Sequence, residues 1–283
     1  MSTMVTEGRR SSIAPRVASY LLMAIMAVLA LYPLVWMALG SLKSGGEFYT
    51  NIWGLPADPQ WRNFPDAWVR GGLGIKFLNS AIVTFGTLAI TLPVTSIAAY
   101  AITSMDFRGR SLAYGALLLG IMIPFGVTAI PVFSVIAQLG LLNTRLALVL
   151  VYSAQAVAFS TFLMCAFFQS LPAEIEEAAR LEGCTRFSAF WRVMLPLARP
   201  GLAAQAVFVG TTAWNEYFLA SLIIRDPARE TIPVGLVSFT GRYATDYPAL
   251  FAALTMATLP LLALYLLAQK QFVAGLTGGA VKG

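Results

Sequence analysis

Six long apolar stretches divide this 283-residue chain, and they constrain its fold more than any other feature. A helix that crosses the hydrocarbon core of a bilayer needs about 20 mostly apolar residues. The stretch at 200–224 contains one charged side chain, Glu216, and the other five contain none. We therefore expect six transmembrane helices, near residues 18–40, 78–103, 112–136, 146–168, 201–223 and 248–268.

The composition indicates the same class of protein. Hydrophobic residues make up 58% of the chain, charged residues make up 11%, and the mean hydropathy is +0.74. These values suit a polytopic membrane protein and not a soluble domain. The net charge of +6 comes from bases scattered over short loops, so no clustered basic face points to a nucleic-acid partner. The sequence predicts one all-α integral membrane domain over residues 1–283.

Basic residues indicate how the chain is inserted. Arg9, Arg10 and Arg16 precede the first span, which is longer than the apolar region of a cleavable signal peptide, so we expect it to be retained as an anchor. With the N-terminus inside, the cytoplasmic segments hold eleven lysines and arginines and the outer segments hold eight. The positive-inside rule favours this orientation modestly. Six spans then place both termini in the cytoplasm, with residues 269–283 as a tail.

Prolines in the second and third predicted spans are expected to bend these helices. Pro93 lies in the second span, and Pro124 and Pro131 lie in the third. Each frees a backbone carbonyl and bends its helix, which membrane proteins tolerate where a neighbour or a cavity satisfies the freed group. Kinks for packing are the more common case, and hinges for alternating access are the alternative.

Two longer segments lie on the outer side in this orientation, at residues 43–76 and 225–246. The first mixes tryptophans with prolines, which is typical of irregular backbone anchored at the membrane interface. The second carries both acids and bases and is a candidate for touching a soluble partner. A solvated connector explains it equally well.

A polar segment at residues 169–200, here called the docking loop, separates the fourth span from the fifth. Pro172 followed by acids in the first turn predicts the start of a helix, because the helix dipole favours negative charge there. Glu176 and Arg180 are spaced for an ion pair, and Gly183 suits a left-handed C-terminal cap. Thr185 is a fair N-cap for a second helix that runs to Pro196. Two short helices joined by a bend are therefore expected.

The charge of the docking loop favours a protein partner over a lipid surface. Amphipathic helices that lie on lipid headgroups are usually rich in lysine and arginine on one face. This loop carries four glutamates and four arginines, so its attraction to anionic lipid should largely cancel.

The order of residues in this loop resembles a known motif. Glu177, Ala178 and Ala179 are followed by Gly183 and then by Leu195–Pro196. This spacing resembles the cytoplasmic loop by which ABC importer permeases engage their ATPase subunits. The turn at 139–144, the segment 171–202, the run 214–217 and the glycine-rich ending 271–283 are similar to the smaller permease subunit of the maltose-type carbohydrate importers. The resemblance covers most of the chain from about Phe77 onward, with Glu182 where many relatives carry Asp.

That resemblance implies a type I ABC importer permease fold in a bacterial cytoplasmic membrane. It also implies four partner chains: a second homologous permease, two cytoplasmic ATPases that bind ATP and magnesium, and an extracytoplasmic sugar-binding protein. By resemblance, the residues that couple to the ATPase are Glu177, Ala178, Ala179, Gly183, Leu195 and Pro196. The tail residues Gly278, Gly279, Lys282 and Gly283 would reach toward the ATPase dimer interface.

Polar groups inside the predicted spans mark a candidate solute pathway. They are Tyr152, Ser153, Gln155, Trp214, Asn215 and Glu216. Aromatic faces beside hydroxyl and amide groups are what a sugar ring requires. The same side chains also form hydrogen bonds between membrane helices, and the sequence leaves both roles open.

The residues needed for catalysis are absent. The chain contains no histidine, which excludes a Ser-His-Asp triad and histidine-containing zinc sites, and its two cysteines form no metal or disulfide framework. A phosphate-binding P-loop is also missing, so we expect neither an enzyme nor a cofactor in this chain. Two alternatives to a sugar importer subunit stay open: an importer permease for another solute such as a polyamine or amino acid, and an ion-coupled carrier. Glu216 alone is a thin basis for the carrier.

Overall fold

The structure is a computed structural model that describes residues 13–241 and 245–280. Within these residues it is helical, and its extended pairing is limited to one isolated bridge between Thr240 and Thr245. The long helices are α1 (Ile13–Gly40), α4 (Leu73–Ser104), α7 (Arg145–Ser170), α11 (Arg199–Asn215) and α14 (Tyr247–Ala280). The shorter α-helices are α2 (Gly45–Thr50), α3 (Asn63–Arg70), α5 (Arg110–Met122), α6 (Phe125–Gln138), α8 (Ala173–Leu181), α9 (Arg186–Ala189), α10 (Leu195–Leu197), α12 (Phe218–Ile223) and α13 (Ile232–Leu236).

Four helices of the described chain are long and apolar enough to cross a membrane. They are Arg16–Gly40, Leu73–Ser104, Arg145–Ser170 and Tyr247–Gln269. Two further pairs of helices pass the same test together but are bent at a short break, which raises the number to six if each pair is one span. The all-α, multi-span class expected from the sequence is therefore confirmed.

The third expected span is divided in the structure. Instead of one helix near 112–136, α5 and α6 meet at an angle of 107°. Ile123 and Pro124 are both extended at the junction, with ψ of 116° and 129°. The proline ring excludes the helical conformation for the residue before it, so the helix ends there. Pro131 lies inside α6, so only the first of the two prolines divides this span.

The fifth expected span, near 201–223, is also divided. Helix α11 ends at Asn215 and α12 begins at Phe218, with Glu216 extended between them. The Glu216 carboxylate accepts hydrogen bonds from the backbone N–H groups of Leu219 (2.8 Å) and Ala220 (3.0 Å). An acidic cap satisfies donors that the start of α12 would otherwise leave unpaired in an apolar surrounding. Helix α11 also meets the end of the docking loop at 74°.

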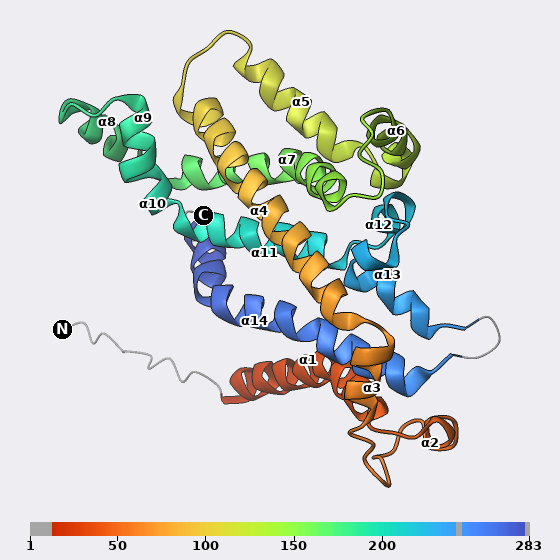
Figure 1. Ribbon diagram of the computed structural model, residues 1–283. Coiled ribbons are helices and arrows are strands. Elements are labelled where there is room, and N and C mark those ends of the chain that lie inside the picture. The colour runs from red at the N-terminus through yellow and green to blue at the C-terminus, as the bar shows by residue number, and fades with distance from the viewer. Residues whose placement is uncertain (1–12, 242–244, 281–283) are drawn as a thin grey trace, which may run out of the picture.

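Helix α4 lies at the centre of the bundle and packs mainly against α7 and α11 (Figure 1). Hydroxyl side chains recur along its buried face every three or four residues: Ser80, Thr84, Thr87, Thr91 and Thr95. Gly86 lies against Val149 of α7 so closely that a Cβ there would be 2.9 Å from a valine methyl. Small residues allow membrane helices to approach closely, and this seam holds the bundle together. Gln205 of α11 donates a buried hydrogen bond to the Thr95 hydroxyl across the seam.

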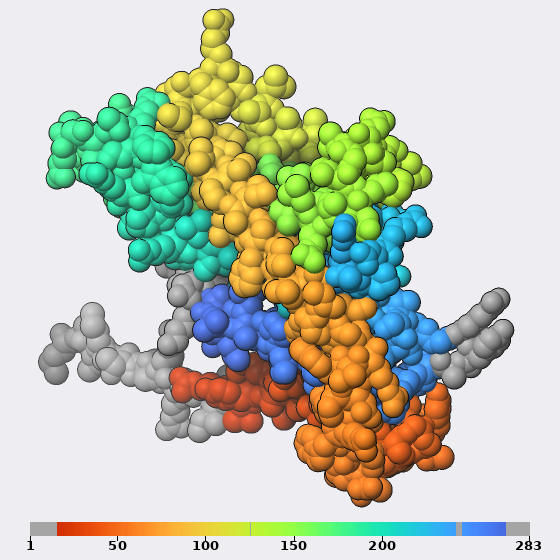
Figure 2. Space-filling model, in the orientation of Figure 1, coloured from red at the N-terminus to blue at the C-terminus, as the bar shows by residue number. Residues whose placement is uncertain are grey.

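The two ends of α4 meet different parts of the chain (Figure 1). Its C-terminal end contacts the docking loop, where Tyr100 of α4 is buried with Phe168 of α7 and Phe190. Its N-terminal end contacts residues 228–232 of the segment 225–246, here called the distal loop, which contains α13. Figure 2 shows the docking loop projecting from the body of the molecule at the edge farthest from α2 and α3. The bundle therefore separates the two loops along its length.

Candidate functional site

The first helix of the docking loop ends in a tight glycine turn. Helix α8 begins after Pro172, carries Glu174 and Glu176 in its first turn and ends at Leu181. Gly183 adopts φ of 90°, and its N–H donates to the Arg180 carbonyl at 3.1 Å. The N–H of Cys184 donates to the Ala179 carbonyl at 3.0 Å. These two bonds form a Schellman motif, so the C-terminal cap expected at Gly183 is confirmed.

The second half of the loop is less regular than expected. Thr185 caps α9 by accepting a hydrogen bond from the N–H of Ser188 at 3.2 Å, as its sequence position predicts. The chain then widens into a π-helix over Phe190–Met194 before α10. Pro196 explains the change, because it has no N–H to donate to the carbonyl four residues earlier. The N–H of Leu195 bonds to the Phe190 carbonyl, five residues back.

A buried tyrosine joins the docking loop to the spans. The Tyr100 hydroxyl of α4 donates to Glu176 Oε1 at 2.8 Å and lies 3.3 Å from the Arg186 carbonyl oxygen. Its ring packs on Phe190 and Phe168, with centroids 5.1 and 5.9 Å away. The ion pair expected between Glu176 and Arg180 is not formed in the described structure, because the Glu176 carboxylate turns inward to the phenol. Tyr100 therefore contacts both short helices of the loop.

The residues predicted to couple to an ATPase divide into two groups. Glu177, Ala178 and Gly183 are exposed on the outer side of the loop. Ala179 is buried, and Leu195 and Pro196 are half-buried on the inner side, where Leu195 packs against the core cluster around Tyr100. The first group is free to touch a partner, and the second group holds the loop on the spans.

Sequence reasoning missed two exposed apolar side chains on this surface. Leu181 is 89% exposed at the end of α8, and Phe187 is 73% exposed in α9, with its ring 6.1 Å from that of Trp191. The signal was present, since apolar residues at the tip of a polar loop are unusual unless they are covered. Leu181 lies between the exposed Ala178 and Gly183 in the sequence, and Phe187 follows Gly183 by four residues.

Three of the predicted pathway residues have hydrogen-bond partners between helices. The Tyr152 hydroxyl donates to Glu216 Oε2 at 2.5 Å, so this carboxylate holds α7 as well as capping α12. Trp214 Nε1 donates to the Ala257 carbonyl of α14 at 3.1 Å. The alternative left open by the sequence, hydrogen bonds between helices, applies to these three.

The other three predicted pathway residues differ from these in burial and in hydrogen bonding. Asn215 is exposed, while Ser153 is buried and Gln155 is half-buried. The Ser153 hydroxyl and the Gln155 amide nitrogen are buried atoms without a hydrogen-bond partner among the described residues. Buried polar groups are nearly always satisfied in folded proteins, so these two are the predicted pathway atoms that still need a partner.

Helix α14 carries Gly278 and Gly279 close to its C-terminal end. The tail residues Lys282 and Gly283 lie outside the described residues. No group of three or more histidine, cysteine, aspartate or glutamate side chains that could hold a metal occurs in 13–241 and 245–280.

The distal loop is tied to the spans by a polar network. Lys76 of α4 forms an ion pair with Glu230 at 2.6 Å, and their side chains are 7% and 21% exposed. Asn79 donates to the carbonyls of Ala228 (3.0 Å) and Glu230 (2.8 Å). The Ser80 hydroxyl accepts from the N–H of Ile232 at 2.9 Å. These bonds hold residues 228–232 against the first two turns of α4.

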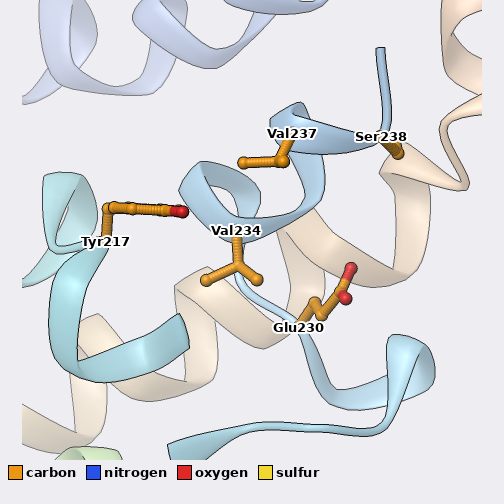
Figure 3. A pocket seen from close by; sticks show the side chains of 5 residues that line it. All are labelled: Tyr217, Glu230, Val234, Val237 and Ser238. Atoms are coloured by element: carbon orange, nitrogen blue, oxygen red, sulfur yellow. The ribbon is translucent and has the colours of Figure 1, made fainter. Parts of the chain in front are cut away.

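A pocket of about 270 Å³ lies between this network and the break of the fifth span (Figure 3). Tyr217, Glu230, Val234, Val237 and Ser238 line it. In Figure 3 the Tyr217 side chain lies on one side of Val234 and the Glu230 side chain on the other. Tyr217 belongs to the run 214–217 noted in the sequence, but none of the six predicted pathway residues lines this pocket.

Comparison with known proteins shows which family this chain resembles. Residues 91–277 match the family described as binding-protein-dependent transport system inner membrane component. A probable ABC transporter permease protein of Bacillus subtilis is 38% identical over 252 residues, which cover 89% of this chain and 84% of that protein. The diacetylchitobiose uptake system permease protein of Streptomyces coelicolor is 34% identical, with 93% of this chain and 88% of that protein covered.

A solved structure agrees in fold. A chain in the crystal structure of a bacterial ABC transporter that imports the acidic polysaccharide alginate superposes with a TM-score of 0.80 at 24% identity, and the match covers 95% of this chain and all of that one. The type I importer permease fold is therefore confirmed. Membership of a binding-protein-dependent family decides against the ion-coupled carrier, in line with the Glu216 carboxylate being occupied by three hydrogen bonds. The chain belongs to the binding-protein-dependent transport system inner membrane components, and it is a multi-pass membrane permease subunit of an ABC importer and not an enzyme.

Proposed function

We propose that this chain is the smaller permease subunit of an ATP-driven carbohydrate importer. The docking loop is the observation that carries the proposal, because it presents Glu177, Ala178, Leu181 and Phe187 outward while Tyr100 holds its inner side to the spans. The carbohydrate part is supported by the relative that serves diacetylchitobiose uptake.

The outer side of the docking loop suits a protein cleft. Leu181 and Phe187 are large apolar side chains at a water-facing end, and covering them removes apolar surface from water. Ala178 is small enough to allow close approach of a second surface. The Gly183 turn fixes the angle at which the two short helices enter that cleft. A cytoplasmic ATPase, which binds the ATP and magnesium, is the partner that this surface fits.

A second, homologous permease completes the pathway. Thr211, Thr212 and Asn215 are exposed on one side of α11, inside a span. Polar groups within the bilayer seldom face lipid, and they usually face a protein interior or a water-filled path. Asn215, with Ser153 and Gln155, is therefore our choice for pathway contacts, while Tyr152, Trp214 and Glu216 position the helices that carry them.

Transport follows from a rigid-body shift. When two ATPases close on ATP, each moves the loop seated in it, and the contact between Tyr100 and Glu176 passes that motion to α4. The docking loop lies in the cytoplasm in this arrangement, and so do both termini, with Gly278 and Gly279 on the same side. The distal loop then faces the extracytoplasmic sugar-binding protein.

Uptake by reconstituted vesicles tests the proposal. The complete transporter, purified with its partner subunits and supplied with the binding protein, should accumulate diacetylchitobiose only when ATP is present on the ATPase side. Ionophores that collapse proton and sodium gradients should leave uptake unchanged. Uptake of spermidine or an amino acid in place of any sugar would overturn the carbohydrate assignment.

A photoreactive side chain at position 178 tests the docking surface separately. It should crosslink to the ATPase subunit, while the same group at the exposed Asp58, at the other end of the molecule, should not. Crosslinks from position 178 to phospholipid alone would contradict the docking role.

A further inference from the structure

We propose that the pocket between Tyr217 and Glu230 binds one uncharged sugar ring at the distal end of the permease, before the solute enters the pathway. The inference rests on the proposed function and adds to it a site and a preference for uncharged over acidic sugars. Its residues lie outside the docking loop and outside the pathway residues predicted from the sequence.

The pocket is preformed because its acidic wall is fixed in three ways. Lys76 pairs with the Glu230 carboxylate, and the Glu230 carbonyl accepts a hydrogen bond from Asn79. Gly235 makes the ion pair possible, since a Cβ at that position would collide with the Lys76 side chain on its way to Glu230. A further hydrogen bond, from the N–H of Ile232 to the Ser80 hydroxyl, holds the backbone that leads into α13. A binding group that is already immobile loses little entropy when a ligand arrives.

The lining offers what a pyranose ring uses. Glu230 Oε2 is engaged by Lys76, which leaves the other carboxylate oxygen to accept a sugar hydroxyl. Ser238 donates its own proton to the Gly235 carbonyl at 2.6 Å, so its oxygen is an acceptor for another hydroxyl. The Tyr217 ring is 46% exposed and, with Val234 and Val237, offers an apolar face for the C–H side of a sugar. Pockets that combine apolar walls with a few placed polar groups are typical ligand sites.

The volume and charge of the pocket restrict the class of ligand that it can bind. A volume of about 270 Å³ lies just below the usual range for ligand pockets and suits one ring and not a chain of rings. The lining residues include no lysine or arginine, and the Lys76 ammonium is neutralised by Glu230. Because the Lys76–Glu230 pair is neutral as a whole, the pocket offers an acidic sugar no net positive charge to offset the loss of its hydration. The site therefore favours a neutral ring.

The position of the pocket also supports a role in binding the solute before it enters the pathway. Tyr217 is the residue at the break between α11 and α12, and it follows the exposed Asn215 by two residues. A ring held against Tyr217 is thus next to the polar side of α11 that we assign to the pathway. The distal loop supplies the other wall, so the pocket joins the loop to the entrance of the span.

Two variants of the complete reconstituted transporter test the site, with diacetylchitobiose as the neutral probe and an alginate-derived disaccharide as the acidic one. Tyr217→Ala removes the apolar face and should raise the KM for diacetylchitobiose about tenfold with a smaller change in Vmax. Glu230→Gln leaves the Lys76 ammonium unpaired at the pocket, so it should weaken use of the neutral probe and shift the ratio of uptake toward the acidic one. Tyr20→Ala, which removes an exposed tyrosine of α1, is the matched control and should change neither value.

Binding without transport gives a second readout. Saturation-transfer NMR on the purified complex, without binding protein, should show transfer to the acetyl methyl groups of diacetylchitobiose, and this transfer should be lost in Tyr217→Ala and kept in Tyr20→Ala. Thermal unfolding of each variant shows whether it is folded. If the unaltered transporter takes up no carbohydrate, the proposed function fails and this inference fails with it. If it takes up diacetylchitobiose but Tyr217→Ala and Glu230→Gln leave KM, probe preference and NMR transfer unchanged, this inference alone is overturned.

Discussion

The two ends of α4 are held in opposite ways. Lys76 and Tyr100 are separated by about 36 Å of helix, at 1.5 Å per residue. At the distal end, Lys76, Asn79 and Ser80 make four polar contacts to residues 228–232. At the docking end, one tyrosine hydroxyl and a cluster of aromatic rings make the contact. The distal end is fixed by directional bonds, whereas the docking end has a packed contact that can follow the motion of its partner.

The surfaces beyond these contacts differ as well. The docking loop leaves Leu181 and Phe187 uncovered, and the distal loop lines an open pocket with a carboxylate on one wall. An uncovered apolar surface needs a partner protein, while a small polar pocket suits a solute. The same helix thus joins the proposed ATPase contact to the proposed solute pocket, and variants at each end should have separable effects.

The largest effect is expected from Gly183→Asp at the docking end. Any side chain is strained at φ of 90°, and a new carboxylate would enter the surface that meets the ATPase. We expect ATP-driven uptake to fall more than tenfold while the protein still inserts in the membrane. Uptake in vesicles and co-purification of the ATPase measure this.

Gly109→Asp is the matched control for that change. Gly109 also has φ of 90°, and open space surrounds its Cα, as at Gly183, but it lies outside the docking loop. Equal loss of uptake in both variants would mean that backbone strain, and not docking, explains the phenotype.

The second-largest effect is expected from Lys76→Met at the distal end. Removing one partner of a largely buried ion pair leaves Glu230 without its counter-charge, and we expect the unfolding free energy of the permease to fall by about 2 kcal/mol. Thermal unfolding in detergent measures the change. The double variant Lys76→Met/Glu230→Gln should recover more than half of the loss, because no unpaired charge remains. A double variant less stable than the single one would show that the ion pair is not what fixes this end.

Tyr100→Phe should have a smaller effect on stability and a specific effect on coupling. The change removes the hydroxyl that donates a hydrogen bond to Glu176 and keeps the ring packing. The unfolding free energy should fall by about 1 kcal/mol. We expect the number of sugars moved per ATP hydrolysed to fall severalfold, with ATPase association retained. Tyr114→Phe, in the same core cluster, is the control. An unchanged transport ratio in Tyr100→Phe would remove this residue from the path of transmission.

The smallest effect on stability is expected from Leu181→Ser. Its side chain is 89% exposed, so the unfolding free energy of the isolated permease should change by less than about 0.5 kcal/mol. The amount of ATPase retained on the purified complex should nevertheless fall. A clear loss of permease stability would indicate that Leu181 packs within this chain and would remove it from the docking surface.

Local features of the structure could be predicted from the sequence. The Gly183 turn and the Thr185 cap follow from residues within a few positions of one another, and both occur as expected. The break at Pro124 was anticipated as a bend, but its angle of 107° depends on how α6 packs beyond it. The ion pair spaced for Glu176 and Arg180 was displaced by Tyr100, which is 76 residues away from Glu176 in the chain.

The candidate sites were predictable only in part for the same reason. Composition and spacing selected Tyr152 and Glu216 as polar residues in spans, but no local pattern shows that they bond to each other. Glu230 drew attention only as one charge in a loop, since its partner Lys76 lies 154 residues earlier. The unpaired groups of Ser153 and Gln155 are likewise visible only when every neighbour is in place.

By itself, the sequence determined the membrane class and the two capped short helices of the docking loop, because hydrophobic length, charge and backbone caps are local properties of the chain. The tertiary structure decided which polar side chains tie helices together, which are buried without a partner and which stay exposed. That division has a physical cause: within a bilayer each polar group must find a partner, and packing brings that partner from a distant part of the chain.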